Sequence, residues 1–129
     1  FGAKAVIVPK HKAVALTPVV RKVACGAAEL IPLVIVPNLA RALEVCQKEG
    51  LWSIGLDGDV DVTLPETALK RSLVMVLGAE GHGLRAQTRQ LCDEVAAIPL
   101  PGNIPSLNVS VAAGIALYAA EMASPRAII

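Results

Sequence analysis

Residues 73–84 read Leu-Val-Met-Val-Leu-Gly-Ala-Glu-Gly-His-Gly-Leu and carry the clearest indication of a fold in this chain. The continuous apolar run predicts a buried strand over 73–77, since strands covered on both faces are apolar throughout. Arg85 to Cys92 predicts a short helix after the loop. The loop between them leaves backbone amides and carbonyls unpaired at the strand end, where a ligand can use them.

A second strand and loop follow the same plan. Val95 to Ile98 predicts a strand, and Leu107 to Glu121 predicts the last helix. Between and around them, residues 98–110 read Ile-Pro-Leu-Pro-Gly-Asn-Ile-Pro-Ser-Leu-Asn-Val-Ser. We expect the ends of the two strands to line one pocket, because each strand ends in a small or polar loop.

The glycines of the first loop do not follow a common nucleotide-binding pattern. Their order is G-x-x-G-x-G without a lysine, whereas dinucleotide loops read G-x-G-x-x-G and phosphate loops end in Gly-Lys-Ser/Thr. Glycines permit unusual backbone angles and close approach of a ligand. As a bare pattern, a structural tight turn fits the loop as well as a binding site does.

The rest of the chain alternates between strand and helix signals. Residues 57–71 have mixed polarity without a clear period, which predicts a surface connection. Asp57, Asp59 and Asp61 lack the later residues of a calcium loop, so we expect no metal. The other expected elements are strands at Lys4–Val8, Leu33–Val36 and Trp52–Leu56, a helix opened by Thr17-Pro18, and a helix from Leu39 to Gly50. This alternation predicts a mostly parallel sheet with helices on both faces.

Length and composition fit one α/β domain over residues 1–129. The sequence is 54% hydrophobic but only 2% aromatic, which disfavours aromatic platforms for stacking bases. The formal charge of +1 predicts no electrostatic partner. Several basic residues nevertheless precede Glu29, the first acid, and form either a phosphate-binding edge or an ordinary solvated surface.

Cysteine usage and hydropathy predict a soluble cytoplasmic protein. Cys25, Cys46 and Cys92 are odd in number and lie in apolar surroundings, which favours reduced, buried thiols. The longest apolar stretch is too short to span a bilayer, and we expect no signal peptide. The start at Phe1-Gly2 predicts an upstream helix, because glycine commonly follows a helix end.

Residues 73–84 and 98–110 resemble the second and third signature motifs of the SpoU-type RNA ribose 2′-O-methyltransferases. Four shorter segments resemble the branch that methylates a guanosine ribose in bacterial 23S ribosomal RNA: 4–9, 23–29, 37–41 and 55–58. The resemblance implies an α/β-knot (SPOUT) fold with a C-terminal trefoil knot, S-adenosylmethionine as cofactor, an RNA partner and a homodimer, with no DNA or membrane partner. The small residues of the last helix would pack either between subunits or on their own sheet.

The resemblance also assigns a cofactor site. It implies that Gly78, Ile98 and Leu107 contact S-adenosylmethionine, largely through backbone groups. An adenine ring needs apolar walls, and Leu77 and Leu100, together with Ile98 and Leu107, are side chains of the right kind.

Three polar residues are implied to act on the acceptor side. Glu80, by itself a solvated loop acid, would give positioning or electrostatic support. Ser106 and Asn108 would form hydrogen bonds near the substrate ribose, although either also suits the N-terminal cap of the following helix. Arg85 and Arg89, four residues apart, would face either RNA or solvent.

The usual base of this family is an arginine of the first motif, which we expect to lie upstream of Phe1 together with the first strand. Residues 1–129 alone would then transfer methyl groups hardly at all. The rival hypothesis is a non-catalytic RNA-binding or ribosome-assembly protein that retains the knot fold.

Overall fold

A computed structural model describes residues 1–10, 22, 26–67, 69–78 and 83–124. The chain divides into two compact units, one comprising residues 2–42 and the other residues 43–129 together with Phe1. The helix predicted at Thr17-Pro18 lies outside the described residues.

The smaller unit is built on a parallel strand pair. Strand β1 (Val6–Pro9) pairs with β2 (Leu33–Val36), with Val6 opposite Leu33. A short helix, α2 (Ala27–Leu30), precedes β2. Helix α3 (Leu39–Lys48) begins after the predicted cap, and its residues from Leu43 onward belong to the larger unit. The Asn38 Oδ1 atom accepts a hydrogen bond of 3.1 Å from the backbone N–H of Arg41.

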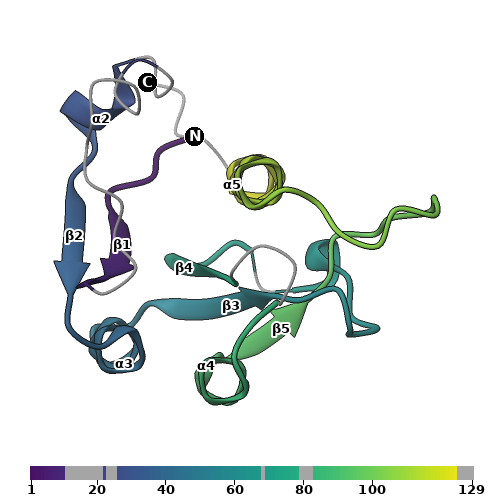
Figure 1. The fold of residues 1–129 in the computed structure, drawn as a ribbon, viewed down its shortest axis with the longest axis horizontal. Coiled ribbons are helices and arrows are strands. Elements are labelled where there is room, and N and C mark those ends of the chain that lie inside the picture. Colours follow the sequence, from purple (N-terminus) through teal and green to yellow (C-terminus); the bar gives the residue numbers. More distant parts are fainter. Residues whose placement is uncertain (11–21, 23–25, 68, 79–82, 125–129) are drawn as a thin grey trace. The chain divides into compact units, whose positions relative to one another are not determined.

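The larger unit carries a parallel sheet in the strand order β4-β3-β5 (Figure 1). Its described elements are β3 (Trp52–Leu56), the 3₁₀ helix η2 (Leu64–Glu66), β4 (Leu73–Leu77), α4 (Ala86–Leu91), β5 (Glu94–Ala96) and α5 (Val109–Ala123). Both β4 and β5 run parallel to β3. The predicted parallel α/β fold is therefore confirmed in this unit.

The two faces of this sheet are covered by different helices, as predicted (Figure 1). Successive side chains of β4 point to opposite faces of the sheet, as in any β-strand. Leu73, Met75 and Leu77 pack in one apolar cluster with Ala116 of α5. Val74 and Val76 pack in a second cluster with Leu43, Leu84 and Leu91, from α3, the chain before α4, and α4.

Helix α5 turns its small residues toward its own sheet. Ala116 is fully buried, and Ala119, Ala120 and Ala123 pack against the same cluster. Of the two packing arrangements considered for the small residues, packing on their own sheet is observed for these alanines, whereas an added Cβ on Gly114 would meet nothing within 4 Å.

The prediction that residues 57–71 form only a surface connection is wrong. Leu64 and Leu69 are buried in the cluster beneath α5. The chain also pairs with the end of β5, because the Leu64 N–H donates to the Ala97 carbonyl and the Ala97 N–H donates to the Val62 carbonyl. At Ala97 this pairing replaces the pairing between β5 and β3, so β5 ends at Ala96 and not at the predicted Ile98.

A polar network fixes β3 beside β5 at the start of the strands. The fully buried Ser53 donates from its backbone N–H and its hydroxyl to Asp93, each at 2.8 Å. Burial by itself raises the pKa of Asp93, but the hydrogen bonds from Ser53 and Gln47 and the positive charge of Arg71 outweigh it and lower the pKa. The guanidinium of Arg71 also stacks over the Trp52 ring.

Cys46 and Cys92 are free thiols, as predicted, but both are only partly buried. Burial, followed by the negative charge of Asp93, raises the pKa of Cys92 to about 11. Cys25 lies outside the described residues.

None of the described helices is long and apolar enough to cross a membrane.

Candidate functional site

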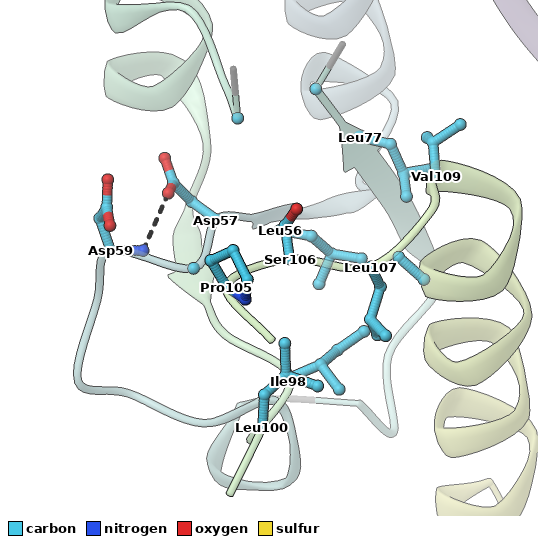
Figure 2. A pocket seen from close by; sticks show the side chains of 14 residues that line it. Leu56, Asp57, Asp59, Leu77, Ile98, Leu100, Pro105, Ser106, Leu107 and Val109 are labelled. Carbon is cyan, nitrogen blue, oxygen red and sulfur yellow. Dashed lines mark hydrogen bonds between the residues drawn. The ribbon is translucent and has the colours of Figure 1, made fainter. Parts of the chain in front are cut away.

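A cavity of about 360 Å³ opens where the chain leaves the carboxyl ends of β3, β4 and β5 (Figure 2). Leu56 ends β3 and Leu77 ends β4, while Ile98 follows β5 by two residues. Ligands of open α/β sheets bind at this end of the strands, where loops meet and backbone groups are unpaired. The predicted pocket between two strand ends is thus present.

Apolar side chains form much of the cavity wall (Figure 2). The four residues predicted as walls, Leu77, Ile98, Leu100 and Leu107, all line the cavity, and so does Gly78. They come from the end of β4 and from the loop before α5. The structure therefore gathers every residue of the predicted cofactor site around one space, although their role as ligands stays a prediction.

Gly78 and Gly83 lie backbone against backbone at the cavity. A Cβ atom on Gly78 would lie 1.9 Å from the Gly83 carbonyl oxygen, closer than real Cβ atoms approach other atoms. Gly83 itself has φ of 61°, in the left-handed region that favours glycine. Glycine is therefore required at position 78 because a side chain would overlap the backbone of Gly83, and it is favoured at position 83 by the left-handed conformation.

Of the three acceptor-side residues, Ser106 lines the cavity (Figure 2). Asn108 is the N-terminal cap of α5: its Oδ1 accepts a 2.9 Å hydrogen bond from the Ser110 N–H and another from the Ser110 hydroxyl. The cap role considered for Asn108 is thus observed. Glu80 belongs to residues 79–82, outside the described part of the chain.

Two carboxylates at the cavity were not among the predicted site residues. Asp57 and Asp59 line it beside the end of β3 (Figure 2). The Asp57 side chain is only 8% exposed and pairs with Arg89, whose Nη1 lies 3.3 Å from Oδ2. Arg89 therefore pairs with an acid of the cavity wall, a partner that neither RNA nor solvent, the two predicted alternatives, includes. Asp57 directly follows a parallel strand, a position that favours function, but it also opens the segment 57–71, which the sequence predicts to be a surface connection.

Comparison with known proteins places these features in a family. Residues 1–118 match the SpoU rRNA Methylase family. The chain belongs to that family. The resemblance of its two long motifs is thereby confirmed, and the cavity lies between the two segments that carry them.

Similar proteins include the 23S rRNA (guanosine-2′-O-)-methyltransferase RlmB of Pseudomonas putida, which is 56% identical over 119 residues. That alignment covers 92% of this chain and 48% of the relative. RlmB of Escherichia coli K12 is 49% identical, with 92% of this chain and 49% of the relative covered. The chain thus spans about half the length of these relatives.

Solved structures of other proteins share the fold. The SpoU methyltransferase AviRb from Streptomyces viridochromogenes, solved in complex with AdoMet, matches with a TM-score of 0.84 and 28% identity. The match covers 95% of this chain and 50% of AviRb. An RNA 2′-O ribose methyltransferase matches with the same TM-score and 27% identity, over 94% of this chain and 46% of that one.

Proposed function

We propose that the intact protein transfers a methyl group from S-adenosylmethionine to a ribose 2′-hydroxyl of RNA, specifically a guanosine of 23S ribosomal RNA. The observation that carries this proposal is the meeting of the two motif segments at one cavity beside the strand ends. The names of the RlmB relatives support the choice of substrate. Such a substrate places the protein in the cytoplasm.

The cavity suits an adenosine-containing cofactor by size and chemistry. Sites for small molecules typically measure about 300–1,000 Å³ and are mostly apolar with a few polar groups. Leu77, Leu100 and their apolar neighbours would cover the adenine faces, while backbone groups of Gly78, Ile98 and Leu107 would bind its edges and the ribose. The bound cofactor supplies an activated methyl group on a sulfonium.

The chain's own residues would then align the acceptor. Ser106 at the cavity wall and Asn108 at the start of α5 would hold the ribose by hydrogen bonds, with Glu80 giving electrostatic support. Alignment of this kind lowers the barrier, because a fixed near-attack geometry replaces a random encounter. We assign removal of the hydroxyl proton to the arginine that the family carries in its first motif.

We further propose that the intact protein has the trefoil knot of the α/β-knot fold and is a homodimer joined through α5. Large apolar side chains recur every three or four residues on the face of α5 away from the buried alanines, at Val111, Ile115, Tyr118 and Met122. All four are well exposed, Tyr118 at 53%. A continuous apolar stripe of this kind favours burial against a partner.

Charge introduced into this stripe should separate the subunits. We expect Ile115→Glu combined with Tyr118→Glu to convert a dimer into a monomer, because two unpaired carboxylates would be buried at the contact. Size-exclusion chromatography with light scattering measures the mass. Val45→Glu, at an exposed apolar position of α3, is the matched control. A dimer that survives the double change would contradict the proposal.

The reaction itself is tested with the intact protein, labelled S-adenosylmethionine and 23S ribosomal RNA that lacks the modification. Methyl incorporation at one guanosine 2′-oxygen is the expected result. RNA binding without incorporation would contradict the proposal and favour a non-catalytic RNA-binding protein.

Asn108→Ala should lower turnover more than it lowers cofactor affinity, since the side chain is assigned to the acceptor. Loss of the cap alone costs about 1 kcal/mol of stability. Asn38→Ala removes a comparable cap from α3 and serves as control. Equal melting temperatures with reduced turnover in Asn108→Ala alone would support the assignment. Equal turnover in the two variants would leave Asn108 a cap only.

A further inference from the structure

Asp57 carries a buried carboxylate at the cavity, yet the proposed reaction assigns it no role. Asp57 directly follows the last residue of β3, and its side chain is 8% exposed. Burying an ionised carboxylate is unfavourable unless partners replace its water. The partners of Asp57 therefore indicate what its position achieves.

Both carboxylate oxygens of Asp57 have protein partners. Oδ1 accepts a 3.0 Å hydrogen bond from the Asp59 N–H (Figure 2), and Oδ2 lies 3.3 Å from Nη1 of Arg89 in α4. The same carboxylate lies over Gly83, where an added Cβ would be 3.4 Å from each oxygen. Asp57 thus joins the end of β3 to α4 and to the left-handed residue ahead of Leu84.

Gly83 leads from Asp57 to the proposed cofactor contact. Its carbonyl group lies against the Cα of Gly78, so closely that Gly78 has no room for a side chain. A shift of Gly83 would therefore move Gly78, or open the contact between them. Arg89, Asp57, Gly83 and Gly78 form a continuous series of contacts that ends at the cavity wall.

We propose that Asp57 is a positioning residue: paired with Arg89, it holds Gly83, and through Gly83 the backbone of Gly78, in the conformation that the cofactor site requires. This inference rests on the proposed function. The competing role is a direct ionic contact with the positive charge of the methyl donor. Positioning is favoured because both oxygens of the carboxylate are already engaged within the protein.

Binding of two ligands separates the two roles. S-adenosylhomocysteine lacks the sulfonium charge of S-adenosylmethionine but shares its adenosine. We expect Asp57→Asn in the intact protein to weaken both ligands equally, by about tenfold, a size typical of coupled neighbouring residues. Arg89→Gln should give the same loss, and the double variant should add little to it. Asp61→Asn, an exposed acid outside the cavity wall, removes the same charge and should change neither affinity.

A selective loss of S-adenosylmethionine affinity in Asp57→Asn would overturn positioning in favour of direct contact. Unchanged affinities for both ligands would also overturn it.

Hydrogen exchange gives a second measurement that does not depend on the ligand. We expect faster exchange at the Gly83 and Leu84 amides in Asp57→Asn and Arg89→Gln, but not in Asp61→Asn. If the unaltered protein binds neither ligand while exchange responds in this way, the proposed function fails and the positioning role stands. If the unaltered protein binds both ligands and exchange is unchanged in Asp57→Asn, the positioning role fails while the proposed function stands.

Discussion

Gly78→Ala should lower methyl transfer by the intact protein about a hundredfold, the loss expected when a shift of about 1 Å misplaces reacting groups. The added Cβ would lie 1.9 Å from the Gly83 carbonyl oxygen and 2.8 Å from the Leu84 nitrogen. These are backbone atoms, so no rotamer change relieves the overlap. The end of β4 and the residues around Gly83 must therefore move apart. Single-turnover methyl transfer with saturating RNA measures the effect.

Alanine substitutions at two other glycines serve as comparisons for Gly78→Ala. Gly83→Ala meets only ordinary contacts with Asp57 but must hold a side chain at φ of 61°, a strain of about 1–2 kcal/mol. Gly102→Ala lies in the loop before α5, where an added Cβ would meet nothing within 4 Å. We expect the loss to be largest at Gly78, smaller at Gly83 and absent at Gly102. Equal activity in Gly78→Ala and Gly102→Ala would show that the Gly78 contact has no part in the site.

The strands that position the site were predictable because their signal is local. Trp52–Leu56 and Leu73–Leu77 are continuous short runs in which every residue either packs or pairs, and the structure gives both with the predicted bounds. The carboxyl ends of parallel neighbours must meet at one edge of the sheet. The pocket followed from these two facts, and the family motifs selected the residues on its wall.

The parts that escaped prediction depend on partners far along the chain. Asp57 is buried at the cavity because Arg89, on α4, reaches it. The Asp-Gly-Asp sequence carries the same turn signal whether or not such a partner exists. For α5, the composition predicted a helix, but only packing determined that the alanines face the sheet while Ile115 and Tyr118 remain exposed.

Residues 57–71 show the same limit for the core. Leu64 and Leu69 are separated by residues of mixed polarity, Pro-Glu-Thr-Ala, and an irregular segment has no period that would reveal a buried face. The capping box between Thr63 and Glu66 sets the single turn of η2, with Glu66 Oε2 accepting from the Thr63 N–H and hydroxyl. That turn directs Leu64 into the cluster beneath α5.

Leu64→Ala should therefore destabilise the protein by about 2–5 kcal/mol, although it lies in a connection between strands. Leu64 is 2% exposed and belongs to the cluster that seats α5, the helix that follows the cavity loop. Removing its side chain leaves a void that surrounding atoms fill only in part, and this adds to the lost burial. Urea unfolding of the intact protein, followed by circular dichroism, measures the change.

Val62→Ala is the matched comparison, because Val62 lies two residues earlier in the same segment and is 46% exposed. We expect a loss within about 0.5 kcal/mol there, as for most surface substitutions. Leu64→Met conserves volume and should cost less than about 1.5 kcal/mol, so it remains measurable if the alanine variant does not fold. Similar unfolding midpoints for Leu64→Ala and Val62→Ala would mean that the connection contributes nothing to the core, and that α5 is held on the sheet by the strands alone.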